Sequence, residues 1–350
     1  MGQLHRRGMV RTEQGSVGEL GRHQGKFLVQ RILAVLVLAG STSAAGILGG
    51  AASPPPKLPS LTQLEAAISH AVSIKAAPNL LSTIPPLASL NSSDAKLPAF
   101  GAPCTTTTAA SVPQDATQIC QFGDTTAKRT IFVLGDSQAS MWLVAISPIA
   151  KELQWRVVAV AHNGCPPWPD QAATEFDGDP SNGCQSYVSS ALALEKSLRP
   201  QVVIPLGDGF HSGKGVTTSV NQADTAMRAF VKDVAPARVV FISPIPMYQR
   251  SFTSYTPSLC LVVAAKDIRT CEFPPKPMIN RVMWEAEVTT SASEHMPKVN
   301  VTRLFCTTVR CALVVPDAGE RLVYDDSTHA NRFFMAWITS AFEHLLKPAL

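Results

Sequence analysis

From residue 130 to the end of the chain, short apolar runs alternate with longer segments of helical spacing. The apolar runs predict buried strands at residues 130–135, 156–160, 201–206, 238–243 and 298–301. Helical spacing occurs at residues 140–153, 187–198, 217–234, 278–295 and 331–346. Apolar strands that alternate with helices are typical of a parallel sheet covered on both faces. We therefore predict an α/β fold with a central parallel sheet of about five strands. Functional residues are expected beyond the carboxyl ends of the strands.

A separate apolar segment lies near the amino terminus. Residues 32–39 form an apolar run after a basic lead that ends at Arg31, and small residues follow at 40–46. The run has the size of the apolar part of a signal peptide. Taken to Gly50, with the weaker apolar stretch behind it, the segment is just long enough for a membrane span. A cleaved signal peptide, an uncleaved anchor and, less favoured, a buried core helix all fit this pattern.

We accordingly assign residues 1–52 to a signal peptide or membrane anchor. No second run in the sequence approaches the length of a membrane span, which argues against a multi-span membrane enzyme. Basic residues ahead of a span mark its cytoplasmic side. Everything after residue 50 is therefore expected outside the cytoplasm, either membrane-anchored or secreted.

Residues 53–103 resemble a linker. Proline pairs and triplets, at 54–56 and 85–86, interrupt any periodicity between scattered serine and alanine residues. One stretch, residues 61–72, has the spacing of a short helix. We expect a tether that packs in part on the domain, which we place at residues 104–350.

The placement of charge excludes one class of partner. Charged residues make up only 16% of the chain, and the formal net charge is +4. Residues 1–50 hold six basic and two acidic side chains, so the remaining 300 residues hold 24 of each sign and are neutral. Nucleic-acid binding needs a basic surface. We therefore predict no nucleic-acid partner, and we interpret the amino-terminal cluster as a topology signal.

The eight cysteines fit an exported protein, in which an even number favours disulfides. The successive gaps between them are 16, 45, 19, 76, 11, 35 and 5 residues, so short gaps alternate with long ones. The simplest pairing joins neighbours, as Cys104–Cys120, Cys165–Cys184, Cys260–Cys271 and Cys306–Cys311. The alternative is a metal site, but no C-x-x-C pair with companion histidines is present. We predict neither a metal nor another cofactor.

Two short motifs could carry acyl-transfer chemistry. The first predicted strand ends in Gly135-Asp136-Ser137, which places a serine at a strand-to-helix turn, where its own N–H can donate to an oxyanion. Asp326-Ser-Thr-His329 precedes the last helix, and a carboxylate three residues before a histidine can orient an imidazole that activates a serine. Taken alone, each motif is equally a helix cap, because Asp and Ser are preferred at that position.

Together, these motifs and the α/β pattern between them resemble the SGNH/GDSL hydrolase superfamily. Further segments strengthen the resemblance, namely Cys120-Gln-Phe-Gly-Asp124, Asn163-Gly-Cys-Pro-Pro167, the later cysteine pairs and Tyr324-Asp-Asp326. The whole is similar to the SGNH domain associated with acyltransferase-3 membrane proteins, which O-acylate cell-surface polysaccharides. The resemblance covers roughly residues 60–350 and implies a three-layer, flavodoxin-like SGNH fold.

The resemblance implies a role for each matching residue. Ser137 would be the nucleophile, His329 the base and Asp326 the carboxylate that orients it. The N–H groups of Ser137 and Gly164 would form the oxyanion hole. Two positions depart from the pattern: Gly207-Asp208-Gly209 stands where the superfamily has G-x-N-D, and Gln138 stands where this subfamily often has histidine. The first departure leaves the asparagine's hydrogen bond without a candidate.

Several other residues are candidate substrate contacts. They are Asp136, Gln138, His162, Trp168, Asp208 and His211. Trp168 follows two prolines and is expected at the rim of a cleft, whereas Trp142, Trp155 and Trp284 are expected in the core. A glycosidase-type carboxylate pair of Asp136 with Asp325 is the weaker interpretation.

We expect an extracytoplasmic serine-dependent O-acyltransferase or acylesterase that acts on cell-surface glycans. A separate membrane acyltransferase is the expected partner, since the chain lacks the membrane domain of the fused proteins. The alternative is an inactive SGNH-fold domain that binds glycans, which the missing asparagine favours.

Overall fold

The computed structural model describes residues 58–76, 83–84, 120–162, 165–168, 184–207, 219–248, 256–264, 266–275 and 281–350. All of them belong to one compact unit, Pro56–Leu350. The predicted signal peptide or anchor at 1–52 lies outside the described residues. Among the residues that are described, no helix is both long and apolar enough to cross a membrane.

A five-stranded sheet in the order β1-β3-β2-β4-β5 forms the centre of the unit. Four of its strands are parallel neighbours, and β1 pairs with β3 in the antiparallel direction. The strands are β1 (Cys120–Gly123), β2 (Thr130–Gly135), β3 (Arg156–Ala161), β4 (Val202–Leu206) and β5 (Arg238–Val239).

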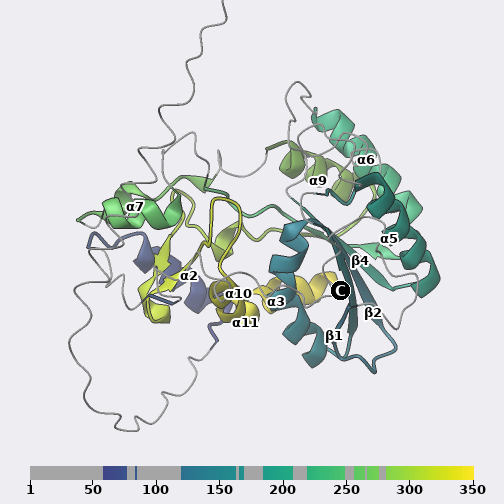
Figure 1. Cartoon of the computed structure of the whole chain (residues 1–350), viewed down its shortest axis with the longest axis horizontal. Coiled ribbons are helices and arrows are strands. Elements are labelled where there is room, and N and C mark those ends of the chain that lie inside the picture. The colour runs from purple at the N-terminus through teal and green to yellow at the C-terminus, as the bar shows by residue number, and fades with distance from the viewer. Residues whose placement is uncertain are drawn as a thin grey trace, which may run out of the picture. The chain divides into compact units, whose positions relative to one another are not determined.

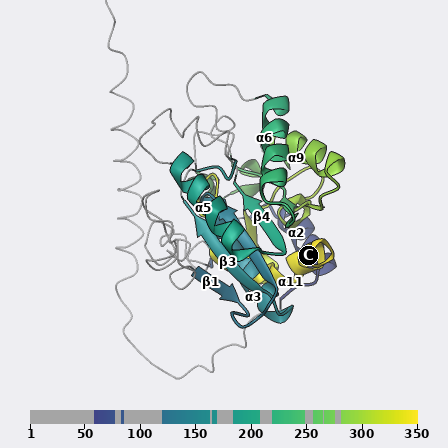
Figure 2. The same ribbon diagram turned by 90° about the vertical axis from the view of Figure 1, so that its right-hand side faces the viewer.

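Alternate residues of the strands face two separate apolar layers. Ile131 and Val133 of β2 belong to the cluster that includes α3 (Ser137–Glu152), whereas Phe132 and Leu134 belong to the cluster on the other face. Helices α5 (Cys184–Leu198), α6 (Val220–Asp233) and α9 (Arg281–Ser293) cover that second face (Figures 1 and 2). The result is the three-layer α/β fold that the sequence predicts.

The order of the strands creates a switch point at the carboxyl end of β2. The chain passes from β2 over one face to β3, and then over the other face to β4 on the opposite side of β2. Ligands of open α/β sheets bind where the winding direction changes in this way. Ser137 lies at that point, because α3 begins directly after β2.

A second group of short elements packs beside α3. Two-stranded sheets pair β6 (Phe241–Ile242) with β7 (Lys298–Val299) and β8 (Val314–Val315) with β9 (Arg321–Leu322). The helices of this part are α7 (Pro257–Val263), α10 (Arg332–Trp337) and α11 (Thr339–Leu346), with short 3-10 turns η6 (Ile268–Thr270), η7 (Thr302–Leu304), η8 (Pro316–Ala318) and η9 (Lys347–Ala349). Figure 1 shows α10 and α11 next to α3.

Three predicted elements differ from the observed ones. The strand predicted at 238–243 breaks at Val240, because Val240 N still donates to Val203 O of β4 while Phe241 N donates to Pro297 O beside β7. The strand predicted at 298–301 therefore pairs with β6, and the fifth strand of the central sheet is β1, which periodicity did not reveal. The helix predicted at 331–346 divides at Ile338, where the Thr339 hydroxyl donates to the Ala336 carbonyl.

The segment predicted as a linker contributes a helix to the core. Helix α2 (Leu61–Ala71) begins with a capping box between Ser60 and Gln63 and buries the apolar face that includes Leu64 and Ile68. Ion pairs of Glu65 with Arg303 and of His70 with Asp317 tie its polar face to η7 and η8. The short helix expected at residues 61–72 is thus present, and it packs on the domain as expected of this segment.

The disulfides that are described follow the predicted neighbour pairing. Cys165 joins Cys184, Cys260 joins Cys271, and Cys306 joins Cys311. Cys120 is also disulfide-bonded, and its predicted partner, Cys104, lies outside the described residues.

Candidate active site

The turn between β2 and α3 can be built only with glycine at its first position. Gly135 has a φ of +152°, and a Cβ there would lie 1.6 Å from the Leu206 carbonyl oxygen of the neighbouring strand. Asp136 N donates to the same carbonyl, and the Asp136 side chain caps α3 by accepting from Gln138 N. Ser137 is thus the first residue of the helix, held where a strand and a helix meet.

The Ser137 N–H is available to a ligand. The first N–H groups of a helix have no partner within the helix, and that of Ser137 makes no hydrogen bond to any part of the chain described by the structure. The helix dipole adds partial positive charge at this end. An oxygen that develops negative charge beside Ser137 would be stabilised there.

Ser137, His329 and Asp326 form one hydrogen-bonded chain. Ser137 Oγ lies 2.7 Å from His329 Nε2, and His329 Nδ1 lies 2.9 Å from Asp326 Oδ2 and 3.0 Å from Asp326 Oδ1. The carboxylate only accepts, so Nδ1 carries the proton. The lone pair of Nε2 then faces the Ser137 hydroxyl, which is the arrangement that general-base activation of a serine needs.

The electrostatics keep Asp326 ionised. Partial burial by itself would raise its pKa, but the His329 side chain and the backbone N–H groups of Thr328 and His329 outweigh this and lower the pKa to about 2. Asp326 is therefore an anion at neutral pH, and it can stabilise the imidazolium that forms when His329 takes a proton.

The neighbouring carboxyl group, Asp325, faces elsewhere. Its side chain accepts a hydrogen bond from Asn331 Nδ2, and its N–H donates to the His329 carbonyl. Burial raises the pKa of Asp325 to about 7, and the Asp326 charge adds to the rise. Of the two adjacent carboxylates, Asp326 is the one that contacts the imidazole.

The loop that carries Asp326 and His329 is fixed from several sides. Gln138 Nε2 donates to Thr328 O at 2.7 Å, and Tyr248 N donates to Ser327 O at 2.7 Å. A bridge between Tyr324 and Ala330 closes the loop at its base. These contacts come from α3 and from the segment after β6. Elements far apart in sequence therefore hold His329 against Ser137.

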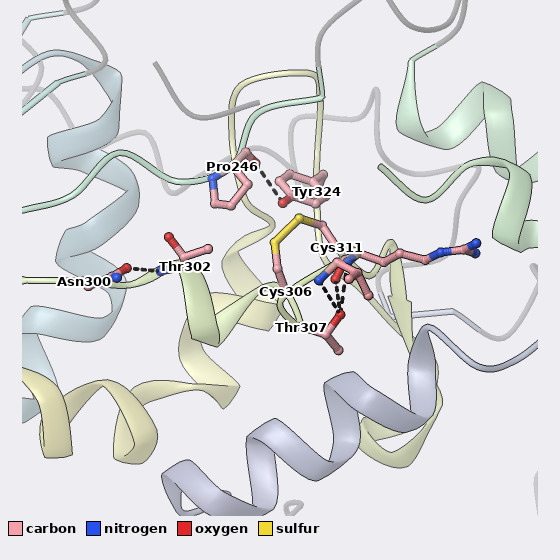
Figure 3. The surroundings of a disulfide bond; sticks show 9 residues. Pro246, Asn300, Thr302, Cys306, Thr307, Cys311 and Tyr324 are labelled. Atoms are coloured by element: carbon pink, nitrogen blue, oxygen red, sulfur yellow. Dashed lines mark hydrogen bonds between the residues drawn. A yellow bond between two sulfur atoms is a disulfide. The ribbon is translucent and has the colours of Figure 1, made fainter. Parts of the chain in front are cut away.

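A disulfide lies behind this loop. The Tyr324 hydroxyl donates to Pro246 O at 2.8 Å, and the Cys306–Cys311 bridge lies next to the Tyr324 ring (Figure 3). Phe305, directly before Cys306, packs on the same ring with a centroid distance of 6.3 Å. Cys306–Cys311 therefore belongs to the support of the loop that presents Asp326 and His329.

Hydrogen bonds from the other face of the sheet hold the turn before Ser137. The buried Tyr187 hydroxyl accepts from Gly135 N at 3.2 Å and lies 2.9 Å from the carbonyl oxygens of Gly135 and Val160. His162 N also donates to Gly135 O. The backbone just before Ser137 is thus tied to both β3 and α5.

The other predicted substrate contacts lie in different surroundings. Asp136 and Gln138 are buried and hold the turn and the base loop, as described above. His162 is 8% exposed and packs against Tyr187, so it has little surface to offer a substrate. Trp168 was predicted at a cleft rim, and the structure corrects this: the ring is 1% exposed and packs on Phe230 and Phe241 in the core. Gly164, Asp208 and His211 lie outside the described residues.

Sequence reasoning missed Tyr187 and Thr328. Thr328 donates its N–H to Asp326 Oδ1 at 2.7 Å, and its hydroxyl lies 3.0 Å from the same oxygen. For Tyr187 there was one signal, because a tyrosine on the buried face of a helix needs a partner for its hydroxyl. Its partner could not be read from the sequence.

A small cavity adjoins helix α3. It is lined by Gln138, Trp142, Leu206, Gly207, Ile242, Ser243, Pro244, Ile245 and Met247. Within the described ranges, no group of three or more metal-ligating side chains converges on a metal position.

Comparisons with known proteins show which family and which solved structures the chain is similar to. A family model described as "SGNH domain (fused to AT3 domains)" matches residues 103–344. Among solved structures, the chain is similar to the lipopolysaccharide acetyltransferase periplasmic domain of Salmonella ser. Paratyphi A, with a TM-score of 0.52, 14% identity, and coverage of 71% of this chain and 91% of that one. The inhibitor-bound aryl esterase of M. smegmatis matches with a TM-score of 0.41, 14% identity, and coverage of 63% of this chain and 100% of that one. No curated protein matches the chain.

The family model covers more than half of the chain, and the fold agrees with it. This match gives the enzyme class, which is an SGNH-type acyltransferase or esterase. Because the model spans residues 103–344, the chain belongs to the family of SGNH domains that are fused to AT3 domains.

Proposed function

We propose that the protein transfers or hydrolyses ester-linked acyl groups through an acyl-enzyme on Ser137. The observation that carries the proposal is the Ser137–His329–Asp326 hydrogen-bond chain, with distances of 2.7 and 2.9 Å. The inactive glycan-binding alternative has less support, because a domain that only binds has no need for this alignment.

The mechanism follows from the protons that each atom can hold. Ser137 Oγ attacks the acyl carbonyl while its proton passes to His329 Nε2, and the carbonyl oxygen becomes an oxyanion near the Ser137 N–H. Collapse of this intermediate expels the donor's alkoxide, which takes the proton from Nε2. An acceptor hydroxyl then gives its proton to Nε2 and attacks the acyl carbonyl, which forms a second tetrahedral intermediate. Its collapse breaks the bond to Ser137 Oγ, and Oγ takes the proton back from Nε2. A sugar hydroxyl as acceptor makes the enzyme a transferase, and water makes it an esterase.

Gly164 N is proposed as the second donor to the oxyanion, by analogy with the family motif after β3. Asp326 stays charged throughout, since its pKa of about 2 is far below that of the imidazolium. Asp208 and His211 follow β4 in the sequence, and they are proposed as substrate contacts because the carboxyl end of β4 lies beside that of β2.

The proposed site of action is the extracytoplasmic face, with a cell-surface glycan as acyl acceptor or acylated substrate. The amino-terminal apolar segment, the described disulfides and the likeness to a domain named periplasmic support the location. The lipopolysaccharide substrate named for that structure supports a glycan. The family's fusion to AT3 domains supports a separate membrane acyltransferase as partner.

The direct test uses Ser137→Ala and an aryl acetate substrate. Loss of one member of such a triad commonly lowers kcat by several orders of magnitude, so turnover is expected to fall to near background. Wild-type protein is expected to be labelled by a fluorophosphonate probe, and the variant is not. Ser140→Ala, in the same helix, is the matched control and should keep both activities.

Turnover or labelling that survives in folded Ser137→Ala protein would contradict the assignment. Thermal unfolding of both variants checks the fold. Adding a sugar acceptor to the same assay then separates transfer, which forms an acylated sugar, from hydrolysis, which forms free acetate.

A further inference from the structure

The edge of the central sheet opposite the active site carries a row of arginines. Arg129 directly precedes β2, Arg156 begins β3, Arg199 lies three residues before β4, and Arg238 begins β5. The four strands are parallel neighbours, so all four residues lie at the same edge. Backbone hydrogen bonds connect the row, from Arg156 N to Arg129 O, from Gln201 N to Thr130 O and from Arg238 N to Gln201 O.

We define the basic edge as the residues around these strand starts, 124–130, 151–156, 196–201 and 232–238. It contains eight basic and three acidic side chains. The rest of residues 51–350 holds 16 basic and 21 acidic side chains and is therefore acidic. Three of the lysines, Lys151, Lys196 and Lys232, lie in the last turns of α3, α5 and α6, where a cation complements the helix dipole. The four arginines precede or begin strands. Arg129 donates to the Leu153 carbonyl at the end of α3 and Arg156 donates to the Thr130 hydroxyl. Arg199 and Arg238 make no side-chain hydrogen bond to the part of the chain that the structure describes.

The pairing of the arginines also sets this edge apart. Arg129, Arg199 and Arg238 are exposed and Arg156 is half-buried. None of the four forms an ion pair with another residue in the described part of the chain. Five arginines elsewhere in the domain each pair with a carboxylate, namely Arg228, Arg269, Arg281, Arg303 and Arg310. Within the described ranges, no carboxylate therefore neutralises the charge of these four arginines.

We propose that the basic edge docks on an anionic lipid surface. Neighbouring strands are about 4.8 Å apart, so the four arginines form a row about 14 Å long. A row of this length fits a surface with many anionic groups better than one small anion. Guanidinium groups bind phosphate oxygens with two parallel hydrogen bonds, which suits phospholipid headgroups.

The predicted anchor would keep the whole domain close to such a surface. The predicted membrane segment ends by residue 52 and α2 begins at Leu61, so eight residues separate them and span at most about 28 Å. In this orientation Ser137, at the other end of the six-residue strand β2, faces away from the lipid at a distance of roughly 20 Å. The docking rests on the proposed location of the protein and does not depend on its catalytic mechanism.

The test is amide hydrogen exchange of the full chain in two bilayers, phosphatidylcholine alone and an equimolar mixture with phosphatidylglycerol. Peptides from the basic edge are expected to exchange more slowly on the anionic bilayer only. The protection should disappear in about 1 M salt, where the Debye length falls to about 3 Å. It should also be lost in the double variant Arg199→Gln/Arg238→Gln, whose side chains make no described contact that the fold needs.

The control is Arg269→Gln/Arg281→Gln, which removes the same charge elsewhere and should keep the protection. Aryl acetate turnover should be unchanged in both double variants. Equal exchange on the two bilayers, protection that survives Arg199→Gln/Arg238→Gln, or protection by soluble polyphosphate but not by the anionic bilayer would each overturn the proposal. Flotation with the neutral vesicles reports the predicted anchor separately, so failure of the location and failure of the docking are distinguishable.

Discussion

At the scale of single residues, the two adjacent aspartates make opposite contributions to the site. Asp326 contacts His329 through both oxygens, whereas Asp325 contacts Asn331. Their pKa values differ in the same sense, about 2 for Asp326 and about 7 for Asp325. One carboxylate is thus suited to stabilise an imidazolium, and the other to accept a hydrogen bond within the loop.

We expect Asp326→Asn to lower kcat far more than Asp325→Asn, with little change in KM for either variant. An orienting carboxylate acts mainly on the transition state, in which the imidazolium forms. The difference in kcat should be at least about tenfold, or about 1.4 kcal/mol. Steady-state kinetics of both variants on one aryl acetate measure it. A larger loss in Asp325→Asn would place the histidine's partner one residue earlier.

Gln138 follows Ser137 in the sequence, and its side chain donates to the carbonyl of Thr328, which precedes His329. We therefore expect Gln138 to act as a positioning residue. Gln138→Leu removes the hydrogen bond to Thr328 O and should lower kcat by roughly tenfold, the equivalent of one hydrogen bond, while KM stays the same. Gln138→Glu should be at least as damaging, because a carboxylate would face the carbonyl. Gln121→Leu, on the exposed side of β1, is the control; an equal loss there would point to a general effect on the fold.

At the scale of elements, short covalent loops hold the segments that frame the site. Cys165–Cys184 joins the segment after β3 to the start of α5, which carries Tyr187. Cys260–Cys271 ties the middle of α7 to the residue after η6, and Cys306–Cys311 supports Tyr324. Elements of two to seven residues bury little apolar area on their own, so cross-links of this kind add order that packing alone would not supply.

Peptide mapping without reduction should recover the three described bridges and the pair Cys104–Cys120. The last pair is predicted from the alternation of gaps and from the disulfide-bonded state of Cys120. Mass spectrometry of the cross-linked peptides gives the pairing directly. Cys120 found joined to any cysteine other than Cys104 would contradict the rule of neighbour pairing.

At the scale of the whole molecule, stability should depend on pH through buried carboxyl groups. Glu195 is 4% exposed, and burial raises its pKa to about 7, with Lys196 opposing the rise. Asp325 shifts in the same direction. A raised pKa means that the folded state holds the proton when the unfolded chain has lost it, so stability falls as the pH rises from about 4.5 to about 7.

We expect the Tm to decrease between pH 5 and pH 8, and Glu195→Gln to reduce this decrease. The substitution removes a contribution of up to about 3 kcal/mol at pH 8. Thermal unfolding at both pH values measures the effect, with exposed Glu152→Gln as the control. A Tm that rises with pH, or a slope that Glu195→Gln leaves unchanged, would be inconsistent with a protonated Glu195.

The sequence by itself determined the features that depend on local pattern. Apolar runs located β2, β3 and β4, because a strand buried on both faces must be apolar throughout. Helical spacing located α3, α5, α6 and α9 to within a few residues, and the gap pattern predicted the three described disulfides. The motifs singled out Ser137, Asp326 and His329, since strand-to-helix turns and helix starts leave a sequence signature.

Only the tertiary structure decided which segments far apart in sequence meet. Nothing in the local pattern indicates that Phe241 leaves the central sheet to pair beside β7, that β1 forms its edge, or which elements the helix α2 packs against. The 2.7 Å contact of Ser137 with His329 and the hydrogen bonds of Tyr187 likewise join residues separated by 192 and 52 positions. Trp168 is the clearest case: flanking prolines favoured an exposed rim, whereas burial against Phe230 and Phe241 removes a large apolar ring from water. Local pattern determines the elements, and the packing of the whole chain determines which of their side chains meet.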